Sequence, residues 1–148
     1  MTEIDFHFGV PAPQAYACRL VRKALRSGAS VAVTGPADLL DALDRELWSF
    51  EAEEFVPHAR AERALDVPAS LHATTAWLAA EPEAVPAHDV LVNLGATVPR
   101  GFEAFRRLIE IVPNDDAGKT AARSRWKGYA GRGYAIRSHA VGSEGVAP

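Results

Sequence analysis

The chain has 148 residues, of which 48% are hydrophobic and 24% charged, and this composition excludes disordered and fibrous proteins. Its net charge of -3 is unevenly distributed: residues 1–116 carry 10 basic and 18 acidic side chains, whereas residues 117–148 carry 6 basic and 1 acidic. An acidic body lacks the array of cations that broad contact with a DNA backbone needs. The charge pattern therefore favours a protein partner over nucleic acid.

The length indicates one domain, which we assign to residues 1–139, followed by a flexible tail over residues 140–148. The single cysteine, Cys18, excludes an internal disulfide, and its apolar neighbours indicate a small core residue rather than a nucleophile. The sequence shows neither a secretory signal nor a long apolar span, so we expect the protein in the cytoplasm.

The first half of the chain alternates strand and helix patterns. Residues 2–8 alternate apolar and polar side chains, which is the period of a strand. We then expect a helix, a buried strand and a second helix over residues 11–27, 30–34 and 38–48. This β-α-β-α order predicts a parallel sheet with right-handed crossovers.

The second half continues the pattern less regularly. Extended segments are expected at residues 55–57, near a sheet edge, and at 72–78, 89–93, 109–112 and 134–139, with a surface loop over 79–88 and a short helix over 102–108. The whole chain is thus predicted to be a single-domain α/β, Rossmann-like protein with a mostly parallel sheet and flanking helices.

A basic helix is predicted to follow Pro113. Asn114 or Asp115 can cap it by accepting a hydrogen bond from a free backbone N–H, and acidic side chains are favourable at this positive end of the helix dipole. Small residues recur on one arc of the helix, and we expect this stripe to face the core. The stripe consists of Ala117, Ala121, Ser124 and Gly128.

Another face of this helix carries the residues expected to bind a ligand. Arg123, Trp126 and Lys127 are related by i, i+3 and i+4 spacing, so two cations flank one indole. Arginine offers a planar fork to a carboxylate, lysine a mobile charge and tryptophan a rigid apolar wall, which suits the end of an acidic peptide. The alternative is a solvated basic face whose Trp126 belongs partly to the core, and the pattern leaves both interpretations open.

Two separated segments resemble the chi subunit of bacterial DNA polymerase III. Val112-Pro113, the acidic pair that follows, and the run R-x-R-W-K-x-Y from Arg123 to Tyr129 are similar to one segment of that family. Leu47-Trp48, followed at the family's spacing by Phe55-Val56-Pro57-His58, is similar to another. The resemblance covers residues 2–135.

The resemblance implies a non-catalytic adaptor of the polymerase III holoenzyme in DNA replication, which links the clamp loader to single-stranded DNA-binding protein. The acidic, Phe-ended tail of that protein would lie on the basic helix, with Arg123 and Lys127 taking its charges and Trp126 its apolar end. Val112 would line the floor. One departure is Ala130, where the enterobacterial proteins have an arginine, and Arg132 is the candidate replacement.

Two further groups of residues complete the match. By resemblance, Trp48, Phe55, Val56 and Pro57 form the surface that docks the psi subunit or a helicase. The pattern alone favours a packing role for them, because the same residue types fill a core where a helix meets a sheet. Arg125 and Tyr129 match the family as well, but they lie on another flank of the helix and are assigned to the fold.

Other kinds of site find little support. Gly118-Lys119-Thr120 is the end of a phosphate-binding loop signature, but the glycine that the motif needs five positions earlier is Pro113, so no nucleotide cofactor is expected. The histidines lack a paired spacing and one cysteine cannot build a zinc site, so no metal is expected. A small enzyme using the carboxyl edge of the sheet, or a module that binds single-stranded DNA directly, stays open as an alternative.

Overall fold

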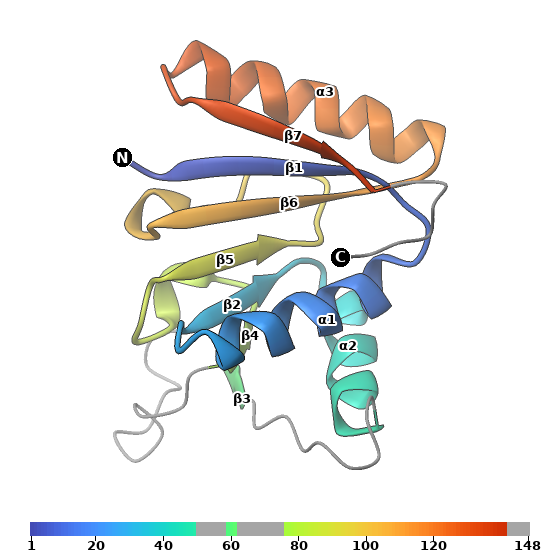
Figure 1. The fold of residues 1–148 in the computed structure, drawn as a ribbon, viewed down its shortest axis with the longest axis vertical. Helices are drawn as coiled ribbons and strands as arrows, with labels where there is room; N and C mark the ends of the chain where they lie inside the picture. The colour runs from blue at the N-terminus through green and yellow to red at the C-terminus, as the bar shows by residue number, and fades with distance from the viewer. Residues whose placement is uncertain (50–58, 62–75, 142–148) are drawn as a thin grey trace.

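The computed structural model describes residues 1–49, 59–61 and 76–141 of the chain (Figure 1). Its helices are α1 (Pro13–Arg26), α2 (Ala37–Ser49) and α3 (Asp116–Gly131). Its strands are β1 (Glu3–Val10), β2 (Val31–Thr34), β3 (Ala59–Ala61), β4 (Ala76–Ala79), β5 (Val90–Asn93), β6 (Arg107–Pro113) and β7 (Ile136–Ala140). Short 3-10 turns at Pro82–Ala84 and Phe102–Ala104 precede β5 and β6.

The strands form one 7-stranded sheet in the order β3-β4-β2-β5-β6-β1-β7. Every described pairing is parallel, and parallel neighbours need crossover connections, which α1 and α2 supply after β1 and β2. The α/β, Rossmann-like class predicted from the alternation of strands and helices is therefore confirmed. The short strand β3 lies at one edge of the sheet. The sequence segment just before it had also been expected near a sheet edge.

A hydrophobic layer covers each face of the sheet. Successive residues of β6 show the alternation: Ile109 and Ile111 join the cluster beneath α1 and α2, whereas Leu108 and Val112 join the cluster beneath α3. In Figure 1, α3 lies beside β7 at one end of the sheet, and α1 and α2 lie nearer β2 and β4. The two helical layers thus occupy different faces and different ends of the molecule.

The prediction of a short helix over residues 102–108 is wrong. Only a 3-10 turn forms at Phe102–Ala104, and β6 begins at Arg107. The reason is hydrogen bonding to the neighbouring segment, because the backbone N–H groups of Arg106 and Arg107 donate to the carbonyls of His88 and Asp89. These bonds hold the chain extended just where a helix would need the same donors.

Three other predictions concern residues that lie wholly or partly outside the described part of the chain. The predicted extended piece at residues 55–57 lies outside the described residues, and the expected 72–78 segment appears as β4 only from Ala76. At the carboxyl end, β7 reaches Ala140, and the N–H of Val141 donates to the carbonyl of Phe8 at 2.8 Å. Residues 142–148, the rest of the predicted tail, lie outside the described residues as well.

A buried carboxylate on β6 fixes α3 to the sheet. Glu110 has no exposed surface, and it accepts hydrogen bonds from Asn93 Nδ2 at 2.9 Å, Arg125 Nε at 3.0 Å and Tyr129 Oη at 2.5 Å. Arg125 also donates to the carbonyl of Ala96 at 2.9 Å. Burial raises the pKa of Glu110, and the charge of Arg125 and the three hydrogen bonds oppose that shift. Burial and the neighbouring carboxylate raise the pKa of Tyr129, which keeps its hydroxyl a donor.

A second buried carboxylate ties β1 to its two neighbours. The side chain of Asp5 is fully buried, and it accepts hydrogen bonds from Arg107 Nε of β6 at 2.9 Å and Arg137 Nε of β7 at 2.8 Å. Burial alone would raise the pKa of Asp5, but the hydrogen bonds from Arg107, Arg137 and His139 and the charge of Arg107 outweigh it, so the pKa is lowered. The edge strand β7 is therefore held by a side-chain ion pair as well as by its main chain.

The hydrogen bonds of Glu110 predict that replacing Arg125 lowers the stability of the protein far more than replacing Arg123, two positions earlier on α3. Arg125→Ala leaves a carboxylate buried without its charged partner and should lower the free energy of unfolding by about 3–5 kcal/mol in urea denaturation. The control Arg123→Ala removes an exposed side chain of the same helix and should change it by less than about 0.5 kcal/mol. Equal effects of the two changes would contradict the assignment of Arg125 to the fold.

Candidate protein-interaction site

The start of α3 is fixed by a side-chain cap and a close approach. The carboxylate of Asp115 accepts a hydrogen bond from the backbone N–H of Gly118 at 2.6 Å, so the cap is Asp115 rather than Asn114. A Cβ on Gly118 would lie 2.9 Å from Cδ of Pro113, closer than real Cβ contacts. The glycine before Lys119 is therefore required by packing against Pro113, which explains the Gly-Lys-Thr run without a phosphate.

The predicted orientation of α3 about its axis is wrong. The side chains that α3 buries are Ala122, Arg125 and Tyr129, and they face β6. The small-residue stripe faces outward instead: Ala117, Ser124 and Gly128 are exposed, and Ala121 is half-buried. The expectation turned the small residues toward the sheet, whereas the bonds of Arg125 and Tyr129 to Glu110 turn the flank that carries these two residues inward, in agreement with their assignment to the fold.

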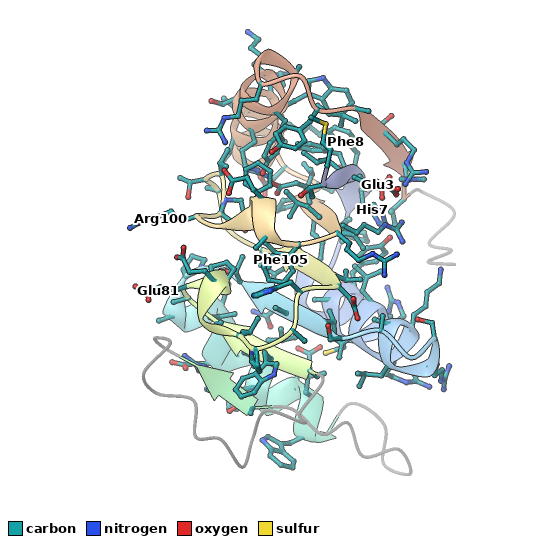
Figure 2. The ribbon with its side chains drawn as sticks, turned by 90° about the vertical axis from the view of Figure 1, so that its left-hand side faces the viewer. Glu3, His7, Phe8, Glu81, Arg100 and Phe105 are labelled. Carbon is teal, nitrogen blue, oxygen red and sulfur yellow. The ribbon has the colours of Figure 1, made fainter. Side chains whose placement is uncertain are left out.

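A groove lies between α3 and the end of the sheet formed by β1 and β7. Its volume is about 340 Å³, and its lining consists of Phe8, Ala122, Arg123, Trp126, Lys127 and Ser138. Phe8 lies between α3 and β7 (Figure 2). The indole of Trp126 is half-buried and packs on Phe6 and Phe8, with ring centroids 5.0 and 6.2 Å apart. Trp126 is thus a wall of the groove that is also anchored in the core.

The rim of this groove carries positive charge that the described part of the chain does not neutralise. Arg123 and Lys127 are exposed, and neither forms an ion pair with a described carboxylate. The three residues predicted to bind on this helix, Arg123, Trp126 and Lys127, therefore do come together around one apolar depression.

Two other expected members of the site lie elsewhere. Val112 is fully buried in the cluster beneath α3 and does not line the groove, so it supports the floor from below. Arg132 does not line the groove either, because its guanidinium lies over the ring of Phe102 at 5.8 Å. Arg132 therefore lies away from the groove that Arg123 and Lys127 line.

Sequence reasoning missed three residues of the groove, Phe8, Ala122 and Ser138. Phe8 is in step with Ile4 and Phe6 on β1, so it was grouped with the core of that strand. The register places Ser138 of β7 beside Phe6, on the same face of the sheet. Because side chains alternate between the two faces of a strand, the sequence of residues 134–139 could have placed Ser138 on that face. Only the order of strands in the sheet shows that β7 adjoins β1.

Of the four residues predicted to form the second surface, the structure describes only Trp48. Its side chain is 57% exposed at the carboxyl end of α2, whereas the preceding Leu47 is buried. Trp48 is therefore not a buried core residue. Phe55, Val56 and Pro57 lie outside the described residues. Because α2 and α3 lie at different ends of the sheet, Trp48 is remote from the groove (Figure 1).

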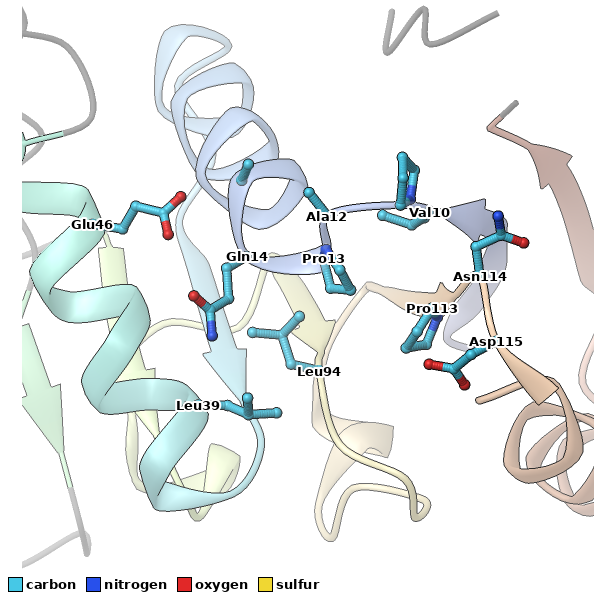
Figure 3. A pocket seen from close by; sticks show the side chains of 12 residues that line it. Val10, Ala12, Pro13, Gln14, Leu39, Glu46, Leu94, Pro113, Asn114 and Asp115 are labelled. Carbon is cyan, nitrogen blue, oxygen red and sulfur yellow. The ribbon is translucent and has the colours of Figure 1, made fainter. Parts of the chain in front are cut away.

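The carboxyl ends of the strands, where open α/β sheets usually bind ligands, form a larger pocket of about 530 Å³ (Figure 3). Prolines and other apolar residues make up most of its lining, together with the amides of Gln14 and Asn114 and the carboxylates of Glu46 and Asp115. The described lining includes no lysine, arginine or histidine. A phosphate would meet negative charge and no cation there, which opposes a nucleotide site.

Features typical of several other functions are missing from the described residues. No group of histidine, cysteine and carboxylate side chains in residues 1–49, 59–61 and 76–141 is arranged to hold a metal ion. No helix in the same part of the chain is long and apolar enough to cross a membrane. Cys18 is buried, and burial raises the pKa of its thiol to about 12, so it is a core residue as predicted.

Comparison with known proteins agrees with the two motifs. The family described as "DNA polymerase III chi subunit, HolC" matches residues 1–137. A DNA polymerase III subunit chi of Pseudomonas aeruginosa is 34% identical over 94% of this chain and 96% of its own length. Its counterpart from Haemophilus influenzae is 33% identical over 85% of each chain, and that from Escherichia coli is 28% identical over 88% and 86%.

The family match covers nearly the whole described fold, and the Pseudomonas relative is aligned over 94% of this chain. The seven-stranded parallel sheet and the motif on α3 fall within the matched range. The chain therefore belongs to the DNA polymerase III chi subunit family, accessory components of a replicative DNA polymerase.

Proposed function

We propose that this protein is a non-catalytic adaptor in DNA replication, which links the clamp-loader complex to the C-terminal tail of single-stranded DNA-binding protein. The observation that carries the proposal is the groove between α3 and β7, an apolar depression whose rim holds two cations without described partners. A disordered tail that ends in acidic residues and phenylalanine has the complementary chemistry.

Each part of the groove has a separate task in this proposal. Trp126 and Phe8 supply an apolar surface for the terminal phenylalanine ring. Arg123 offers two parallel donors to a carboxylate, and Lys127, one helical turn further along, offers a mobile charge to a second one. Because both cations are already solvated at the rim, binding costs less desolvation than a buried ion pair would.

The competing functions are supported less well. Single-stranded DNA is bound by aromatic faces on which bases stack, along a continuous basic track. Trp126 already packs on Phe6 and Phe8, and the described lining of the groove includes two cations rather than a continuous basic track. An enzyme would use the carboxyl edge of the sheet, where the described pocket beside Pro113 is lined by no cation and the described pocket beyond β2 and β5 by one, Arg100. We also propose the cytoplasm as its compartment, because the chain belongs to a family of DNA polymerase III subunits.

The proposal predicts that an acidic peptide ending in phenylalanine binds this protein and that salt weakens the binding. Lys127→Ala should weaken it about 5- to 150-fold, the range of 1–3 kcal/mol for a charge-assisted bond. The matched control is Lys119→Ala, which removes the same charge from the same exposed helix outside the groove and should change the affinity little. Isothermal titration calorimetry measures both, and equal losses would show that the helix attracts the peptide only by its overall charge.

We propose a second binding surface around Trp48, for the psi subunit of the clamp loader or for a helicase. Trp48 is the larger of the two exposed large hydrophobic side chains among the described residues, the other being Met1. Exposed tryptophan is enriched at protein interfaces, because it adds a large contact area. Phe55, Val56 and Pro57 belong to this proposal by resemblance to the family alone.

The second proposal predicts that the two surfaces can be separated by mutation. Trp48→Ala should abolish association with psi or the helicase, yet leave the melting temperature and the affinity for the tail peptide near those of the wild type, because the sites are distant. The control Leu47→Ala truncates the adjacent buried side chain and should cost about 2–5 kcal/mol of stability. A large loss of melting temperature for Trp48→Ala would show that this residue serves the fold.

A further inference from the structure

The strand β7 ends the sheet, and its outer edge has no described partner. Its only described pairing is with β1, and Arg137, Ser138, His139 and Ala140 are all exposed. An open edge strand presents unpaired N–H and C=O groups that can accept another strand. The question is which residues present those groups and whether they lie near the groove.

One hydrogen bond determines the orientation of every peptide group in β7. The N–H of Val141 donates to the carbonyl of Phe8, so it points toward β1. Because successive N–H groups of a strand point to opposite sides, the N–H of His139 also points toward β1. The N–H and C=O groups of Ser138 and Ala140 then point away from β1, toward the open edge.

The same residues adjoin the groove. The side chain of Ser138 lines the groove on the α3 face of the sheet, whereas Arg137 turns to the other face, where it bonds Asp5. A strand added beside β7 would place every second side chain on the α3 face, next to the rim that carries Arg123 and Lys127. Its remaining side chains would point to the opposite face.

We infer that an acidic peptide held in the groove continues as an added strand on the outer edge of β7, bonded to the main chain of Ser138 and Ala140. This inference rests on the function proposed above and states how the peptide is held. A groove of about 340 Å³ accommodates one large side chain, and two cations hold the adjoining carboxylates. Main-chain pairing supplies the contact for the residues before them, independent of their side chains.

The position of β7 suits such an addition. The ion pair of Arg137 with Asp5, at 2.8 Å, and the parallel pairing with β1 hold the strand in place before any peptide arrives. The binding edge is therefore preformed, which lowers the entropy lost on association. The charge of the rim selects an acidic occupant over a second copy of this chain, whose own β7 edge carries Arg137 and His139.

Amide hydrogen exchange tests the inference directly, with the full chain and a saturating acidic peptide that ends in phenylalanine. The amides of Ser138 and Ala140 should exchange fast in the free protein and at least about tenfold more slowly in the complex, because a main-chain hydrogen bond then covers each one. The amide of His139 is the internal control, since it faces β1 in both states and should change little.

A second measurement uses the peptide itself. Methylating its backbone nitrogens one at a time should weaken binding about 3- to 10-fold at alternate positions, because only every second N–H of an added strand faces β7. The intervening positions serve as matched controls. A flat profile, or unprotected Ser138 and Ala140 amides in a complex that still depends on Lys127, overturns the added strand and leaves the proposed function standing.

Two other results would have different meanings. No binding of the peptide at all would overturn the proposed function, and the inference with it. Protection of the Ser138 and Ala140 amides before peptide is added, increasing with protein concentration, would show that a second copy covers the edge and would overturn the inference alone.

Discussion

The carboxylate of Glu110 sits in the middle of an apolar strand, and the position of α3 depends on how that charge is accommodated. A carboxylate without exposed surface must find donors within the protein, because burying it unpaired would cost several kcal/mol. Arg125 and Tyr129 are one turn apart on α3 and reach it at 3.0 and 2.5 Å. Two bonds from one helix to one side chain fix both the height and the rotation of α3 above β6.

That rotation decides what α3 presents to a partner. With Arg125 and Tyr129 turned inward, Trp126 is left half-buried against Phe6 and Phe8, and Arg123 and Lys127 are left at the surface. The groove therefore follows from the buried pair rather than from the binding residues themselves. The motif R-x-R-W-K-x-Y divides accordingly, its second arginine and tyrosine holding the helix and its first arginine, tryptophan and lysine facing the groove.

Much of this architecture could be predicted from the sequence because it depends on local periodicity. Alternation identified β1, the buried runs identified β2 and β5, and the order of elements predicted the parallel sheet. The rotation of α3 could not be predicted from helical periodicity, since that reasoning turns the stripe of small residues inward. The signal was present in another element: Glu110 interrupts the apolar run Ile109, Ile111 and Val112, and a buried acid needs a basic partner.

The remaining differences arise from contacts that are distant in sequence. Residues 102–108 do not form a helix because their N–H groups bond the segment before β5, and no local pattern reports that pairing. Phe8 meets Trp126 because α3 packs on the sheet over β1, and Ser138 lines the same groove because β7 joins the sheet beside β1. The groove is thus assembled from both ends of the chain, and only its α3 half could be predicted.

The central claim is that the rim of this groove holds the terminal carboxylate of an acidic peptide. A double-mutant cycle in calorimetry tests it most directly, with wild-type protein, Arg123→Ala and Lys127→Ala each titrated with the peptide in its free-acid and amidated forms. The account predicts that amidation weakens binding to the wild type but has little further effect on at least one variant, a coupling of about 1–3 kcal/mol. Additive losses in both cycles would contradict it, because the carboxylate would then bind neither cation.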